Sequence, residues 1–113
     1  MQETKAAAGF SALGNATRLA IFRILIQAGA EGCPVGTIQH RLEIPLSTLA
    51  HHLSALVRAG LVAQQKSGRE VICMADYDRL NGLVDYLKEN CCIGVPVSGE
   101  ARDRGARVDE VAS

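Results

Sequence analysis

The sequence lacks any uninterrupted apolar run of about eighteen residues, the length that a membrane-spanning helix needs. It also lacks an opening segment of basic and then apolar residues like that of a secretory signal, so we expect a cytoplasmic protein. Its four cysteines are then better interpreted as thiols than as a disulfide framework. A chain of 113 residues suits one domain with a modest core, which dimerisation would enlarge.

The chain has no excess of either charge, because twelve basic residues balance twelve acidic ones. The balance changes along the chain: residues 1–75 carry seven Lys or Arg against four acids, and residues 76–113 carry five against eight. A DNA-binding surface needs local positive charge and not a basic total. The distribution therefore permits nucleic-acid binding by the first two thirds of the chain.

The sequence is also poor in the groups that a thiol enzyme would use. No histidine occurs after His52, and no Cys-x-x-Cys motif opens a predicted helix. A catalytic thiol needs a base beside it inside a pocket. The histidines lie instead in the part of the chain that we assign to DNA, so we do not expect an enzyme.

Hydrophobic periodicity and capping residues predict a mainly α fold with a small β-hairpin, in the order α-α-α-α-β-β-α. The helices are expected at about 4–13, 16–28, 35–42, 46–59 and 76–92, and the strands at 61–66 and 70–74. Two short helices around the tight turn at Pro45, followed by a hairpin, indicate a winged helix-turn-helix. Residues 1–92 would form this domain, and the small, charged residues of 93–113 a mobile tail.

The helix predicted at 46–59 is the candidate for reading DNA. Its apolar residues fall on one side, and its outer side carries small hydroxyls, one imidazole and a guanidinium that can enter a major groove: Ser47, Thr48, His51, Ser54 and Arg58. Lys66 and Arg69 border the hairpin tip, where such a wing contacts phosphates or a minor groove. The alternative is an ordinary solvated helix and an exposed basic turn. His40 faces either phosphate or solvent, and we expect a half-buried His52 bonded to nearby backbone.

Cys91 and Cys92 are adjacent at the end of the last predicted helix. Thiolates are soft ligands, so such a pair suits a thiophilic ion. Because Leu83, Leu87 and Cys91 repeat at steps of four, Cys91 is expected on the apolar face, with Cys92 turned away. Both sulfurs can bind one ion only if the final turn loosens. The alternative is that Cys91 is a small core residue and Cys92 an incidental neighbour.

Two stretches carry a resemblance to a known family. Leu13–Ile21 (LGNATRLAI) and Ser47–Leu53 (STLAHHL), continued by Ala59-Gly60-Leu61-Val62 and Gly68-Arg69, resemble the ArsR family of metal- and metalloid-responsive repressors. Tyr86–Cys92 resembles the branch that binds trivalent arsenicals or antimonite through a vicinal cysteine pair. The resemblance implies a homodimer, joined by its first and last helices, that leaves double-stranded operator DNA when this inducer binds. It implies no intrinsic cofactor.

The ligand set remains open at this point. That branch often has a third cysteine just downstream, but Ile93–Ser98 contains none. Either Cys73 completes a three-sulfur site, or the site is a true dithiol that favours methylarsenite over arsenite. Cys33 stands alone beside the position of another family metal motif and is interpreted as structural or incidental. Without histidines after His52, zinc or cadmium sensing is not expected. The alternative function is a redox or persulfide-sensing repressor, with Cys73 paired to Cys91 or Cys92.

Overall fold

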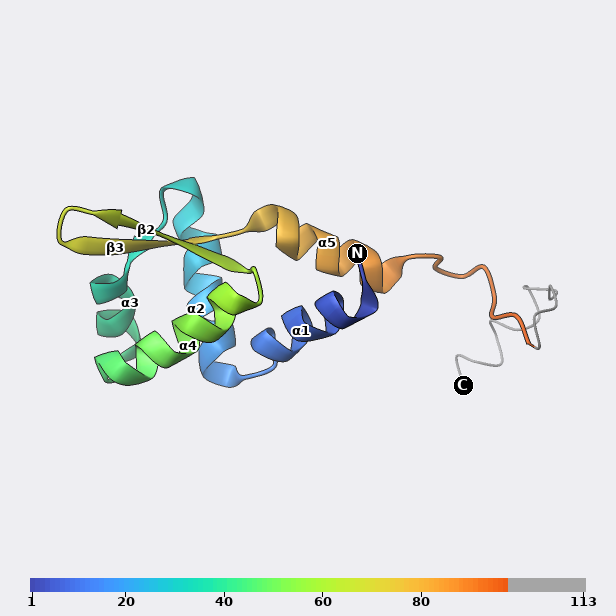
Figure 1. Ribbon diagram of the computed structural model, residues 1–113, viewed down its shortest axis with the longest axis horizontal. Helices are drawn as coiled ribbons and strands as arrows, with labels where there is room; N and C mark the ends of the chain where they lie inside the picture. Colours follow the sequence, from blue (N-terminus) through green and yellow to red (C-terminus); the bar gives the residue numbers. More distant parts are fainter. Residues whose placement is uncertain (98–113) are drawn as a thin grey trace.

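A computed structural model describes residues 1–97 of the chain (Figure 1). Its elements are α1 (Glu3–Leu13), α2 (Ala16–Ala28), a 3-10 turn η1 (Gly29–Glu31), β1 (Cys33–Pro34), α3 (Val35–Leu42), α4 (Leu46–Arg58), β2 (Val62–Ser67), β3 (Glu70–Ala75) and α5 (Tyr77–Lys88). The predicted order of helices and hairpin is confirmed, and α3 has the predicted bounds. Of the predicted mobile tail, residues 98–113 lie outside the described residues.

The strands form an antiparallel sheet in the order β1-β3-β2. β2 and β3 are the predicted hairpin, and its two-residue turn consists of Gly68 and Arg69. The sequence did not predict β1, because a two-residue strand is defined by its distant partner and leaves no periodic pattern. β1 pairs with β3, which places Cys33 directly opposite Cys73.

The core forms where α2 and α4 meet beneath the sheet. Asn15 caps α2, since its Oδ1 accepts a hydrogen bond of 3.0 Å from the backbone N–H of Arg18. Buried apolar residues of α2 and α4 then supply much of the core: Ile21, Phe22, Leu25, Leu49, Leu53 and Leu56. Within residues 1–97, no helix combines the length and apolar character needed to cross a bilayer.

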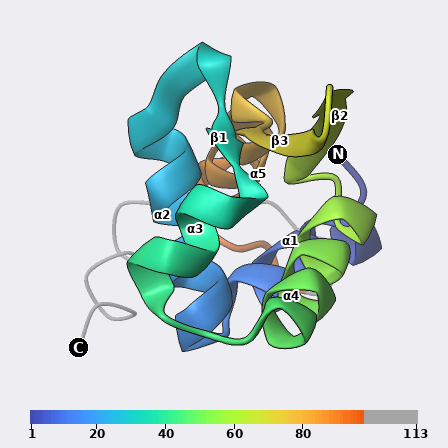
Figure 2. The same ribbon diagram turned by 90° about the vertical axis from the view of Figure 1, so that its left-hand side faces the viewer.

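A tight turn joins α3 to α4 and sets the angle of the helix-turn-helix. Glu43 adopts a left-handed φ of 54°, and its N–H donates to the carbonyl of Gln39 over 2.8 Å. Pro45, in extended geometry, is the N-cap residue that directly precedes α4. Figure 2, a view onto the hairpin end, shows α3 and α4 next to each other with the sheet above them.

Helices α1 and α5 pack closely because α1 presents small residues. A Cβ added at Gly9 would lie 2.8 Å from Cδ1 of Leu83, so a larger residue here would force the Leu83 side chain to shift. Apolar side chains of the two helices nevertheless remain exposed: Phe10 by 36%, Val84 by 43% and Leu87 by 71%. Such a surface is typical of a contact with another protein. That these two helices form a dimer contact stays a prediction.

The prediction that the last helix runs to Cys92 is wrong, because α5 ends at Lys88. Asn90 and Cys92 both adopt left-handed geometry, with φ of 61° and 68°. Asparagine accepts this geometry more readily than most residues, and a basic residue in the last turn followed by asparagine is a stop signal. Cys91 therefore does not extend the apolar face of α5 as predicted, and it is exposed.

Candidate DNA interface and cysteine site

The outer face of α4 carries the five predicted DNA-contacting residues, all of them exposed: Ser47, Thr48, His51, Ser54 and Arg58. Four of them follow one another at steps of four, three and four residues, so they form one stripe along the helix. At its end, Nη1 of Arg58 donates a hydrogen bond of 2.8 Å to Oγ of Ser54. The stripe offers donors and acceptors of the kind that bind base edges and phosphates.

The hairpin provides the second predicted contact. Lys66 in β2 and Arg69 in the turn are exposed, and the hairpin projects at one end of the molecule (Figure 1). Two cations at the tip of a projecting hairpin suit the negative potential of a DNA backbone. His40, on α3, is also exposed.

His52 differs from the prediction. It is half-buried as expected, but its Nδ1 is buried without any hydrogen-bond partner in the described part of the chain. Burial, and then the positive charges of Arg18 and His51, lower the pKa of His52. Its ring centroid lies 5.9 Å from that of His51. His52 is therefore a neutral packing residue at pH 7, close to a group of cations.

A functional candidate that the sequence analysis missed is Arg18, at the start of α2. Its Nε donates to the carbonyl of Ala12 over 2.6 Å, and its Nη2 donates to the carbonyl of Ser11 over 3.4 Å. These bonds hold the guanidinium at the carboxyl end of α1, beside α4. No sequence pattern singled out Arg18, since the approach of α4 to α1 is a tertiary contact.

Cys91 and Cys92 lie in a turn after α5, and their Sγ atoms are 2.7 Å apart. The turn follows from two backbone bonds, from the N–H of Cys91 to the carbonyl of Lys88 and from the N–H of Ile93 to that of Asn90. Two sulfurs bound to one ion at about 2.3 Å can be at most about 4.6 Å apart. The loosened final turn that a shared ion requires is thus present.

The acidity of the pair restricts its chemistry. A hydrogen bond with Cys91, and the charge of that neighbour, raise the pKa of the Cys92 thiol. At neutral pH Cys92 is therefore a thiol, and a divalent cation would have to displace its proton. A trivalent arsenic hydroxide reacts differently, because each thiol replaces one hydroxide and the proton leaves in the water that forms.

The other two cysteines are separate from this pair. Cys73 is fully buried in β3, and the twelve residues of α5, about 18 Å long, lie between it and Cys91. The structure therefore brings Cys73 together with Cys33, not with Cys91 or Cys92. Burial raises the pKa of both buried thiols. Nε2 of Gln64 donates to Sγ of Cys73 over 3.5 Å, which partly offsets that rise.

Sequence comparisons identify related proteins. Residues 13–65 match a family described as a helix-turn-helix domain. An uncharacterised HTH-type transcriptional regulator of Methanocaldococcus jannaschii is 35% identical over 75% of this chain and 93% of its own length. A putative arsenical resistance operon repressor, ArsR, of Halobacterium salinarum is 40% identical over 61% of this chain and 60% of its own length, so the chain spans less than two thirds of that relative.

Solved structures of similar proteins extend the match to most of the fold. An ArsR-like transcriptional regulator from Rhodococcus sp. RHA1 has a TM-score of 0.64 and 31% identity, covering 75% of this chain and 77% of its own. A homodimeric winged helix-turn-helix DNA-binding domain from Mycobacterium bovis, described as a possible ArsR-family regulator, has a TM-score of 0.62 and 27% identity. That match covers 78% of this chain and 82% of the other.

Proposed function

Because the chain belongs to the ArsR family of winged helix-turn-helix transcriptional regulators, we propose that it is a homodimeric repressor that trivalent arsenicals or antimonite release from its operator by binding to Cys91 and Cys92. The relatives are transcriptional regulators, which agrees with the prediction that the chain is not an enzyme. The similar domain from M. bovis is homodimeric, which supports a dimer here.

The observation that carries the proposal is the 2.7 Å separation of the two exposed Sγ atoms. Neighbouring side chains on a helix point about 100° apart, so a helical ending would have separated them. The left-handed Cys92 turns the chain so that both sulfurs face one position. A non-glycine residue in this geometry costs about 1–3 kcal/mol, and such outliers gather at functional sites.

The number of sulfurs favours an arsenical with one carbon substituent. Methylarsenite carries two hydroxides, and two thiols replace both, forming two As–S bonds and releasing two waters. Arsenite and antimonite carry three hydroxides, so a dithiol leaves one of them in place. The buried position of Cys73 in β3 supports the dithiol form of the site over the three-sulfur form.

Release from DNA would act through α5. The pair begins three residues after the last residue of this helix, whose Val84 and Leu87 lie on the exposed apolar surface that we assign to the dimer contact. A bound arsenical fixes the turn and thereby the end of α5, which changes the spacing of the two α4 helices in the dimer. An inducer can shift this equilibrium only by binding the DNA-incompetent form more tightly.

The test is release from DNA by defined metalloids. We expect methylarsenite to release the purified, reduced protein from a duplex that it selects from a random library, at lower concentration than arsenite or antimonite. Fluorescence anisotropy of the labelled duplex measures release, and cadmium serves as the divalent control with little expected effect. If all three metalloids leave the complex intact, the proposed inducer class is wrong.

A second candidate, a thiol redox or persulfide sensor, is favoured by the pairing of Cys33 with Cys73 across β1 and β3. Peroxide would oxidise these two thiols to one disulfide and be reduced to two waters. Burial raises both pKa values, which slows such oxidation. We therefore expect both thiols to stay reduced under peroxide doses that leave the fold intact, as measured by non-reducing mass analysis. A Cys33–Cys73 disulfide that forms together with DNA release would favour the second candidate.

A further inference from the structure

Two hollows flank the DNA-reading stripe of α4, and their linings differ. The hollow between α4 and the hairpin, of about 360 Å³, is lined mainly by apolar side chains such as Val35, Leu53 and Val71, and Arg58 borders both hollows. The hollow between α1 and α4, of about 370 Å³, has small residues along its walls and three cationic or titratable groups around it: Arg18, His51 and Arg58. Among the described residues, 1–97, no carboxylate lines this α1–α4 hollow.

The two guanidinium groups retain unused donors. Arginine has five N–H donors. Within residues 1–97, Arg18 donates to the carbonyls of Ala12 and Ser11, and Arg58 donates to Ser54, so each keeps at least two N–H groups for another acceptor. The bonds to α1 also restrain Arg18 before any ligand arrives. Two guanidinium groups that hydrogen bonds partly restrain, beside a hollow without acids, can bind a tetrahedral oxyanion.

The electrostatic potential around the α1–α4 hollow also favours an anion. His52 lies next to the α1–α4 hollow in sequence and space, and the charges of Arg18 and His51 both lower its pKa. The groups around this hollow thus disfavour a further cation and favour an anion. The hollow also lies directly beside His51 and Arg58, on the stripe that faces DNA.

We propose that the α1–α4 hollow binds one phosphodiester of the DNA backbone between Arg18 and Arg58. A helix in the major groove has a sugar-phosphate backbone on each side. The hairpin cations Lys66 and Arg69 serve the backbone on one side of α4. The α1–α4 hollow serves the backbone on the other side, so α4 is positioned from both edges of the groove. This inference rests on DNA binding through α4 and is independent of the inducer.

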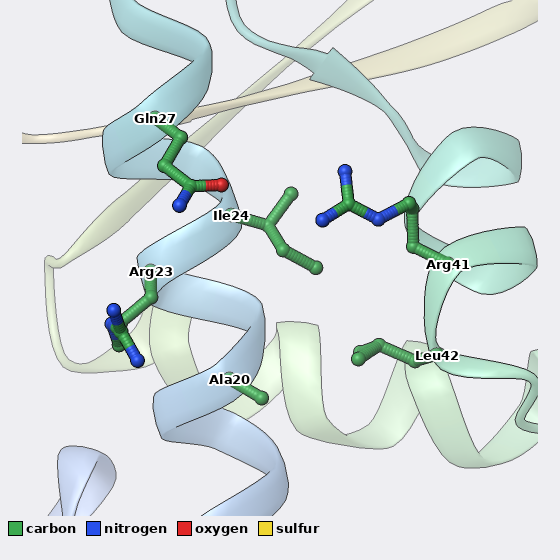
Figure 3. Close-up of a pocket in the computed structure, with 6 residues that line it drawn as sticks. All are labelled: Ala20, Arg23, Ile24, Gln27, Arg41 and Leu42. Carbon is green, nitrogen blue, oxygen red and sulfur yellow. The ribbon is translucent and has the colours of Figure 1, made fainter.

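A third hollow provides the comparison. It lies between α2 and α3, has a volume of about 220 Å³, and is lined by Arg23 and Arg41 without any residue of α4. Figure 3 shows that Arg41, on α3, extends toward α2, whereas Arg23, on α2, points away from Arg41. The two arginines there do not converge, and the hollow does not adjoin the reading stripe. Arg23, on the same helix as Arg18, is therefore a matched control for loss of one positive charge.

The experiment measures how the affinity for DNA depends on salt, without any arsenical. Each phosphate contact contributes about 0.9 to the slope of log K against log salt. Arg18→Gln and Arg58→Gln should each lower this slope by about 0.9 and weaken binding about eightfold at 0.1 M salt. The loss should be equal on a selected duplex and on an unrelated one, because a phosphate carries no sequence information.

The double variant and the control decide the result. If the phosphate is held only while both arginines are present, Arg18→Gln/Arg58→Gln lowers the slope by about 0.9, as each single variant does, and not by about 1.8. Arg23→Gln should leave the slope unchanged. Additive losses, unchanged slopes in both single variants, or an equal loss in Arg23→Gln would each overturn the inference. Since Arg18 also supports α1, Arg58→Gln gives the answer if Arg18→Gln unfolds. Failure of the wild type to bind any duplex would instead overturn its DNA function.

Discussion

Replacing either Cys91 or Cys92 by serine is expected to leave DNA affinity unchanged and to raise the methylarsenite concentration needed for release by about 100-fold or more. The reason is chelation: once the first thiol has bound arsenic, the second lies 2.7 Å from the first and binds at a high effective concentration. A single thiol loses that advantage. DNA affinity is unchanged because the pair is exposed after α5, away from the α3–α4 end of the molecule (Figure 1). Titrating the protein–DNA complex with methylarsenite measures both quantities.

The buried cysteines supply the controls for this result. Cys33→Ala and Cys73→Ala remove sulfur from the sheet, at a cost to stability but not to the response. A loss of response in Cys73→Ala at an intact fold would instead identify Cys73 as a third ligand. If Cys91→Ser/Cys92→Ser is still released at the wild-type dose, the inducer binds elsewhere and the proposed function is wrong.

The position of α4 and its exposed face were predictable because their determinants are local. Pro45 caps the start of α4, and Leu49, Leu53 and Leu56 are buried on one side, so the opposite side must face solvent or DNA. The same applies to the hairpin, whose Gly68 occupies a left-handed position in the turn. Residues that act from one helix or one turn are recognisable from periodicity and turn chemistry alone.

Residues that act across elements were not predictable in this way. The pairing of Cys33 with Cys73 depends on β1, which forms only because β3 returns beside it. The contribution of Arg18 depends on the approach of α4 to α1, which no sequence period reports. The interpretation of Cys33 as a cysteine that stands alone therefore missed its pairing with Cys73.

The end of α5 is a different case, because the sequence holds a stop signal that the prediction did not use. The repeat of apolar residues continued through Cys91 and favoured a longer helix. Lys88 in the last turn and Asn90 after it favoured a stop, and the chain follows these two residues. Periodicity describes which face a helix buries, whereas capping residues determine where it ends. At this site the difference decides whether two sulfurs can share one atom.

Gly32→Ala is expected to lower the free energy of unfolding by about 4 kcal/mol, the sum of backbone strain and overpacking. Gly32 has φ 76° and ψ −169°, a geometry that is almost confined to glycine. A Cβ there would lie 2.6 Å from the carbonyl oxygen of Cys73 and 2.8 Å from Cγ2 of Ile72. The first is a backbone atom of the central strand, so β1 must separate from β3. Because α3 follows β1 directly, the helix-turn-helix would shift as well, and thermal unfolding and DNA affinity should both fall.

Gly29 is the matched control for this effect. It has nearly the same backbone geometry, φ 77° and ψ −159°, but a Cβ added there meets nothing within 4 Å. Gly29→Ala therefore carries the strain alone, about 1–3 kcal/mol, and should leave the sheet and DNA binding intact. The difference between the two variants isolates the contact of residue 32 with β3. Equal losses of stability would show that backbone strain is the whole effect and that the β1–β3 pairing does not depend on the space left by Gly32.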